Sequence, residues 1–98
     1  MYIAIRRMKV RSGLLDEAIL RIENGFVPLI QNMPGFVEYT LMHVADEEGI
    51  TISVFETQEQ AEESNRRAAE WVSQNLVPIA AGQYEIVAIG GIRLRKAK

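Results

Sequence analysis

The chain contains no cysteine, which excludes a disulfide, a thiolate nucleophile and a thiolate metal site. It also lacks an excess of positive charge: 11 Lys and Arg stand against 13 Asp and Glu, for a net charge of −2. A nucleic-acid-binding surface usually requires a strong basic excess. No stretch approaches the roughly 18 apolar residues of a membrane-spanning helix, and no apolar signal-peptide segment follows the N-terminus. These absences predict a cytoplasmic protein that binds neither nucleic acid nor membrane.

The length of 98 residues is enough for one domain and too short for two, so we predict a single domain over residues 1–98. Its last residues, about 92–98, form a predicted basic tail. A domain of this size buries only about 60–65% of the surface of its unfolded chain. A further interface with another subunit would therefore stabilise it.

Four segments are predicted to form strands because their apolar residues alternate along the chain. They span residues 2–10, 36–44, 50–56 and 84–89. Gly90-Gly91 is expected to break the last strand. The strands are apolar on both faces: in the first, Ile3 and Ile5 occupy one face while Ala4 and Met8 occupy the other.

A first helix is predicted between the first and second strands, because the apolar residues from Leu14 onward recur at the helical period. Ser12 is the predicted N-cap, since its hydroxyl can accept a hydrogen bond from the free backbone N–H groups of the first turn. Gly25 and Pro28 weaken the last turns, so we expect a kink or fraying there.

A second helix is predicted to begin after Thr57, where Thr57 and Gln60 match a capping box, and to end near Asn75. Glutamate and arginine four residues apart predict ion pairs on its solvent side, between Glu62 and Arg66 and between Glu63 and Arg67.

The predicted order is strand, helix, strand, strand, helix, strand, which is typical of an α+β, ferredoxin-like βαββαβ fold. Its four-stranded antiparallel sheet would carry both helices on one face. Because two helices cover only one face of a sheet whose strands are apolar on both faces, we predict a homodimer that buries the sheet faces against each other.

Two segments resemble antibiotic biosynthesis monooxygenase-like proteins of the dimeric α/β-barrel superfamily. One is MPGFVEY at residues 33–39, and the other is SVFET at residues 53–57, which leads into a helix carrying Ala69-Glu70-Trp71. The resemblance covers nearly the whole chain and implies two ferredoxin-like units with their sheets packed face to face.

The resemblance implies more than one chemistry. Haem-degrading members use an Asn on the first strand, a Trp on the second helix and a later His. Trp71 matches the Trp, but the first strand offers Arg6 and Arg7 instead of Asn, and no His follows Trp71. This argues against haem degradation. Members that oxidise polycyclic phenols without a cofactor carry an Asn one turn before the Trp, where this sequence has Arg67.

Two residues are candidates for a direct role in chemistry. Trp71 can stack on a flat substrate and donate its N–H to a phenolate oxygen; the alternative is that it is the largest core residue of an Ala-rich helix face. His43, the only histidine, is a candidate general base, because histidine is the residue type that most often does this work near neutral pH. Its alternative role is that of a half-exposed residue at a strand end.

Four residues are candidates for substrate binding. Arg7, with Arg6 beside it, can hold an anion or form salt bridges at the sheet edge. Arg67 lies one turn from Trp71, although Glu63 is a competing partner. Asn75 either offers its amide at a pocket mouth or ends the helix, and Tyr39 lines either the pocket or the dimer core.

The sequence therefore predicts a monooxygenase that acts on a flat, electron-rich small molecule without metal, flavin or other cofactor. One alternative is a dimeric small-molecule-binding or stress-related module without turnover. Another is an isomerase or decarboxylase on the same scaffold, with His43 as the base.

Overall fold

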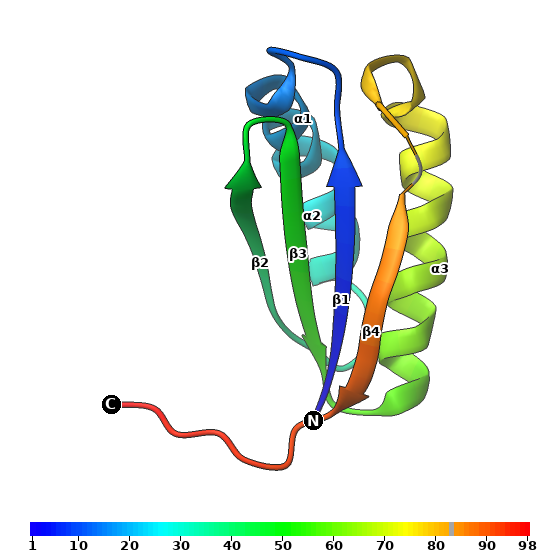
Figure 1. Ribbon diagram of the computed structural model, residues 1–98. Helices are drawn as coiled ribbons and strands as arrows, with labels where there is room; N and C mark the ends of the chain where they lie inside the picture. The colour runs from blue at the N-terminus through cyan, green and yellow to red at the C-terminus, as the bar shows by residue number, and fades with distance from the viewer. Residues whose placement is uncertain (83) are drawn as a thin grey trace.

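The computed structural model describes residues 1–82 and 84–98, which form one antiparallel sheet with helices on one side (Figure 1). The strands are β1 (Tyr2–Lys9), β2 (Phe36–Ala45), β3 (Glu48–Phe55) and β4 (Glu85–Gly91). Their order across the sheet is β2-β3-β1-β4. The predicted α+β, ferredoxin-like fold is confirmed, and each strand boundary lies within two residues of its prediction.

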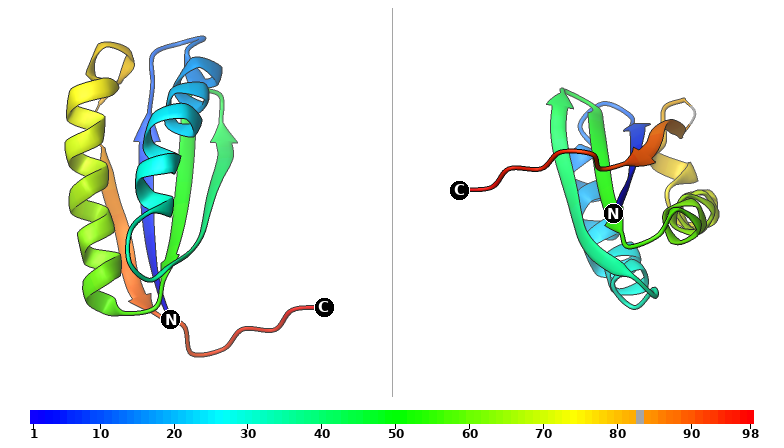
Figure 2. Two further views of the ribbon diagram at one scale, coloured as in Figure 1. Left: turned by 180° about the vertical axis from the view of Figure 1, so that it is seen from behind. Right: turned by 90° about the horizontal axis from the view of Figure 1, so that it is seen from below.

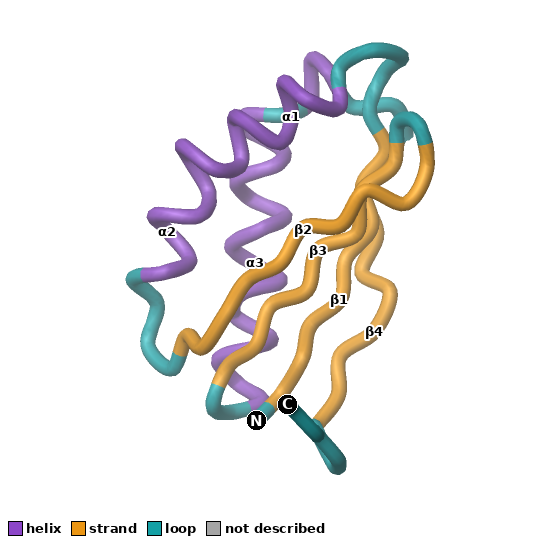
Figure 3. Tube along the Cα trace, turned by 90° about the vertical axis from the view of Figure 1, so that its left-hand side faces the viewer, coloured by secondary structure: helices purple, strands orange, loops and turns teal. Residues whose placement is uncertain are grey.

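All helices pack on the same face of the sheet, so the domain has two layers (Figures 2 and 3). The first helix comprises α1 (Leu15–Arg21), the π-helical turn η1 (Ile22–Phe26) and α2 (Val27–Gln31). The second is α3 (Gln58–Asn75), followed by the short 3₁₀ turn η2 (Val77–Ile79). Within the described part of the chain, none of these helices is long and apolar enough to cross a membrane.

The two faces of β1 have the predicted composition. Ala4 and Met8 are buried against the helices, in a core that includes Phe26, Ile30 and Phe55. Figure 1 looks onto the opposite face, which no helix covers. The residues on that open face come mainly from β1 and β3 and include Ile3, Ile5, Ile50 and Ile52.

The first helix differs from its prediction at both ends. Ser12 does not cap it, because the N-cap is Leu14 and makes no side-chain hydrogen bond. Gly25 and Pro28 do not fray the helix, which continues to Gln31. Instead, one extra residue is accommodated in the π-helical turn that contains Gly25.

Two further details depart from the predictions. Gly90-Gly91 does not break the last strand: Gly91 pairs with Tyr2, and a Cβ on Gly91 would lie 3.2 Å from the Tyr2 ring. On α3, Glu63 pairs with Arg67 at 3.2 Å as predicted. However, Arg66 also pairs with Glu63, at 2.5 Å, instead of with Glu62.

The capping box of α3 is confirmed, and its Gln60 side chain packs against Gly35 in the turn before β2. Thr57 Oγ1 accepts from Gln60 N at 3.2 Å, and Gln60 Oε1 accepts from Thr57 N at 3.0 Å. Gly35, with φ +77°, lies so close that a Cβ there would overlap the Gln60 amide. The left-handed backbone and the close approach both require glycine.

We therefore expect Gly35→Ala to lower the free energy of unfolding by about 2–4 kcal/mol, because it adds left-handed strain and displaces a capping side chain. Gly13→Ala is the matched control: Gly13 has φ +78° but no atom within 4 Å of its added Cβ. It should cost only about 1–2 kcal/mol. Equal losses of stability in urea unfolding of the two variants would contradict the role given to Gly35.

Candidate functional site

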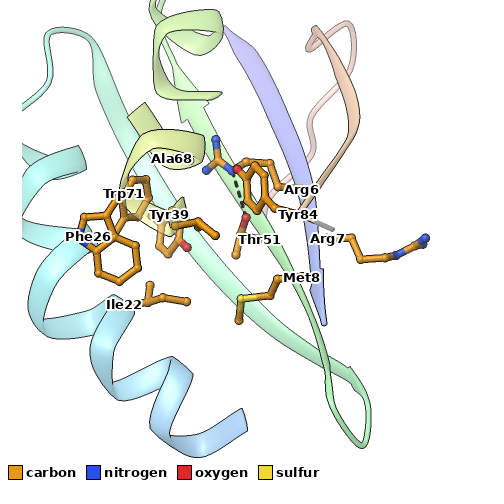
Figure 4. Close-up of a pocket in the computed structure, with 11 residues that line it drawn as sticks. Arg6, Arg7, Met8, Ile22, Phe26, Tyr39, Thr51, Ala68, Trp71 and Tyr84 are labelled. Carbon is orange, nitrogen blue, oxygen red and sulfur yellow. Dashed lines mark hydrogen bonds between the residues drawn. The ribbon is translucent and has the colours of Figure 1, made fainter. Parts of the chain in front are cut away.

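Three aromatic side chains meet between the helices and the sheet (Figure 4). Phe26 from η1 contacts Trp71 from α3, with ring centroids 5.7 Å apart and an interplanar angle of 51°. Phe26 also packs edge-on against Tyr39 from β2, at 5.8 Å and 62°. Phe26 is buried, whereas Trp71 and Tyr39 are half-buried. The cluster forms the apolar side of a site.

The π-helical turn sets the position of Trp71. A Cβ added to Gly25 would lie 2.8 Å from Trp71 Cζ2 and 3.2 Å from Nε1. The edge of the indole that carries the N–H therefore lies against the backbone of η1, and only glycine permits that approach. The faces of the ring are then the surface most suited to contact a ligand.

The other side of the site is formed by Arg6, which is only 1% exposed. Its Nε donates to Thr51 Oγ1 at 3.3 Å, and its Nη2 donates to Ser53 Oγ. Its Nη1 donates to Ser64 Oγ at 3.3 Å and to Asn65 Oδ1 at 2.9 Å. All four acceptors are neutral, and they come from β3 and α3.

No carboxylate pairs with Arg6 in the part of the chain that the structure describes. The Phe26 ring partly offsets the Arg6 charge, since its centroid lies 6.0 Å from the guanidinium carbon. Buried charges in proteins are usually paired, because removing an ion from water costs several kcal/mol. Arg6 therefore leaves the site with a net positive potential.

Two tyrosines lie within the field of this charge. Burial raises the pKa of Tyr84 to about 12, although the Arg6 charge opposes the shift. Burial likewise raises the pKa of Tyr39, while the Arg6 charge and the Thr51 hydroxyl oppose the rise. Both side chains are neutral hydrogen-bond donors at neutral pH. The Tyr84 hydroxyl is buried and has no hydrogen-bond partner among residues 1–82 and 84–98.

These side chains enclose a small cavity that adjoins a larger groove. The cavity has an open volume of about 20 Å³, which is room for a water molecule. The groove runs along α3 toward η2 and has a volume of about 350 Å³. Met8, Val72 and Tyr84 line both spaces, so they form the boundary between cavity and groove.

A family model described as "Antibiotic biosynthesis monooxygenase" matches residues 1–69 of the sequence. The chain belongs to this family. The matched part contains Arg6, Phe26 and Tyr39, whereas Trp71 and Tyr84 lie beyond it. No curated protein matches the sequence significantly.

Solved structures of a monooxygenase, an oxygenase and a heme-degrader have the same fold. The ActVA-Orf6 monooxygenase of Streptomyces coelicolor, in complex with nanaomycin D, is 16% identical; the match has a TM-score of 0.75 and covers 99% of this chain and 91% of that one. A variant of SnoaB, a cofactor-independent oxygenase of Streptomyces nogalater, is 13% identical, with a TM-score of 0.72 and coverage of 99% and 97%. The heme-degrader MhuD of Mycobacterium tuberculosis, with two hemes bound, is 18% identical, with a TM-score of 0.74 and coverage of 99% and 100%.

This member of the family brings together two of the residues predicted for the site, Trp71 and Tyr39. Arg7 contributes to the cavity wall, but its side chain points away from the cavity (Figure 4). Its Nε lies 2.8 Å from Glu48 Oε1, an ion pair without hydrogen-bond geometry, and its Nη1 lies 3.8 Å from Glu85 Oε1.

The other predicted site residues lie outside the cavity. Arg67 is held by Glu63 at 3.2 Å. Asn75 ends α3, and its amide donates to the carbonyl oxygen of Trp71 at 2.9 Å. His43 is exposed on β2. If His43 acted as a general base, it would therefore do so away from the aromatic cluster.

The structure adds Phe26 and Thr51 to the predicted site, and it places Arg6, named above beside Arg7, and Tyr84 on the cavity wall. Strand alternation does place Arg6 on the same face as Ala4 and Met8. Which face the helices cover, however, is decided by packing, and the sequence gives no separate signal for it.

The cavity does not suit haem. Among the described residues, no histidine lines it, so none of them is placed to be an axial ligand of the iron. The described residues also contain no group of three or more His, Cys, Asp or Glu side chains placed to hold a metal ion.

Replacing Gly25 by alanine tests the position of the indole. In an ordinary helix this change stabilises by about 1 kcal/mol. Here we expect destabilisation of about 1–3 kcal/mol, because the new methyl group would overlap Trp71. As Trp71 is the only tryptophan, its emission spectrum should shift as well. The control Asn24→Ala, at an exposed neighbouring position, should leave the stability and the emission spectrum nearly unchanged. An increase in stability on Gly25→Ala would show that the position of the indole does not depend on this contact.

Proposed function

We propose that the protein is a cofactor-independent monooxygenase that acts on a flat, electron-rich organic molecule bound between α3 and the sheet. The observation that carries the proposal is the site itself, in which an aromatic cluster faces a buried cation. Family membership supports an oxygenase chemistry. A pocket with these features can bind a planar ring and stabilise negative charge on it.

The chemistry that such a pocket supports begins when the substrate loses a proton to water, from the hydroxyl of a phenol or from the acidic carbon of an anthrone. The resulting anion reduces dioxygen, and a carbon–oxygen bond forms to give a hydroperoxide. The hydroperoxide then loses water as the carbonyl group of a quinone forms, so one oxygen atom enters the product and the other leaves as water. The contribution of the protein is to orient the ring and stabilise the anion.

Within this proposal Trp71 orients the substrate through the face of its indole. Phe26 packs against the indole, and Tyr39 packs against Phe26 from the sheet. The cavity beside Trp71 is narrow, so a substrate that approaches along the groove requires side chains such as Val72 to move aside.

We expect Trp71→Phe to reduce oxygen consumption at least tenfold with hydroxylated naphthalenes or anthrones, because the smaller ring stacks less well. Circular dichroism and thermal unfolding should show that the variant folds. An oxygen electrode measures the rate, and Gln58→Ala, at an exposed position near the start of the same helix, is the control.

Unchanged turnover in Trp71→Phe would contradict the role of the indole. Ligand binding without oxygen uptake in the unmodified protein would instead support a small-molecule-binding module.

We also propose that the protein is a homodimer through the open face of the sheet. That face carries Ile3, Ile5, Ile50 and Ile52, and the exposed Met42 extends it on β2. An apolar area of this kind on a soluble domain marks an interaction surface. A second copy presents the same face and is the simplest complement to it.

Light scattering after size exclusion should therefore give twice the mass of the chain. Ile52→Lys, which places a charge in the middle of the face, should shift the protein to a monomer. Gln74→Lys, on the helix layer, should leave the mass unchanged. A monomeric unmodified protein would exclude the dimer.

A further inference from the structure

We propose that Arg6 and Tyr84 together bind an ionised oxygen of the ligand, so that the site takes planar aromatic molecules carrying a carboxylate or phenolate. The inference rests on the proposed function only in placing the ligand between α3 and the sheet. It concerns binding of an anion before any reaction with oxygen.

The first support is the hydrogen-bonding capacity of Arg6. A guanidinium has five N–H donors. Four of them are used by Thr51, Ser53, Ser64 and Asn65. One N–H of Nη2 therefore has no acceptor among the described residues, and the four bonds hold the guanidinium in a fixed orientation.

The second support is the charge of Arg6. The ionisable side chains that face it across the cavity are Tyr39 and Tyr84, and both stay neutral at neutral pH. The other arginines near the site differ in this respect: Arg7 is paired with Glu48, and Arg67 is paired with Glu63. Arg6 is thus the cation whose charge a bound anion would balance.

The third support is the hydroxyl of Tyr84. It is buried, and it has no partner among residues 1–82 and 84–98. A buried hydroxyl without a partner costs free energy that a ligand oxygen would recover. Tyr84 and Arg6 both line the cavity (Figure 4), and the Arg6 charge acts on the Tyr84 hydroxyl and opposes the rise of its pKa. A ligand oxygen there can accept from both residues.

The position of Tyr84 also fixes how the ligand lies. Tyr84 lines both the small cavity and the groove. The ionised oxygen and the near edge of the ring fit the cavity end, between Arg6 and the indole of Trp71, while the far edge of the ring extends into the groove. The groove wall there is mostly apolar and includes Val10, Val72, Leu76 and Ala80.

The test compares 2-naphthoate with its neutral analogue 2-naphthamide at pH 7, without oxygen, by calorimetry and by quenching of Trp71 fluorescence. We expect 2-naphthoate to bind at least tenfold more tightly, because hydrogen bonds to a charged group are stronger than those to a neutral one. Equal affinities, or no binding of 2-naphthoate at millimolar concentration, would overturn the proposal.

Tyr84→Phe makes the test specific. The substitution removes only a hydroxyl without a partner, so thermal stability should not fall. The affinity for 2-naphthoate should nevertheless drop about tenfold, whereas that for 2-naphthamide should change little. Tyr2→Phe is the control, since Tyr2 lines neither the cavity nor the groove. Unchanged 2-naphthoate affinity in Tyr84→Phe would contradict the assignment.

Arg6→Met should abolish the preference for 2-naphthoate, and if this variant does not fold, the Tyr84→Phe result decides. The outcome is separate from that of the proposed function. Preferential binding of the anion without oxygen uptake would leave this site standing and remove the monooxygenase activity. Oxygen uptake without any preference for the anion would support the monooxygenase activity and overturn the anion site.

Discussion

The guanidinium of Arg6 is the interaction on which the geometry of the site depends. It ties β1 to β3 through Thr51 and Ser53, and to α3 through Ser64 and Asn65. Hydrogen bonds to a charged group contribute about 1.5–3 kcal/mol each, which offsets the several kcal/mol needed to bury the ion. Because Trp71 follows Asn65 by fewer than two helical turns, the same contacts hold the indole over the sheet.

The sequence predicted those features that depend on residues close together in the chain. Alternation located the strands, and the Thr57–Gln60 box located the start of α3, because both depend on neighbouring residues. The order of the predicted strands and helices identified the fold, and the family resemblance agreed with it. The resemblance also pointed to Trp71, which the structure places in the aromatic cluster.

The remaining features depend on contacts between distant residues. Alternation placed Arg6 on the same face as Ala4 and Met8. Arg7 was predicted to bind the substrate, but it lies on the opposite face, which no helix covers. The π-helical turn was also missed, because Gly25 weakens a helix on any propensity scale. Glycine is needed in this turn because the indole of Trp71, on α3, lies against the backbone of Gly25.

The N-terminus and the end of β4 lie together, far from the groove. The backbone N–H of Ile92 donates to the carbonyl oxygen of Met1 at 2.8 Å. The tail then crosses this end of the sheet (Figures 1 and 2), where Ile92 and Arg95 line a hollow with Val37 and Val54. The groove lies toward the opposite end of the strands, around Lys9 and Ala80. An affinity tag or a surface tether can thus be attached at either terminus while the mouth of the groove stays open to ligands.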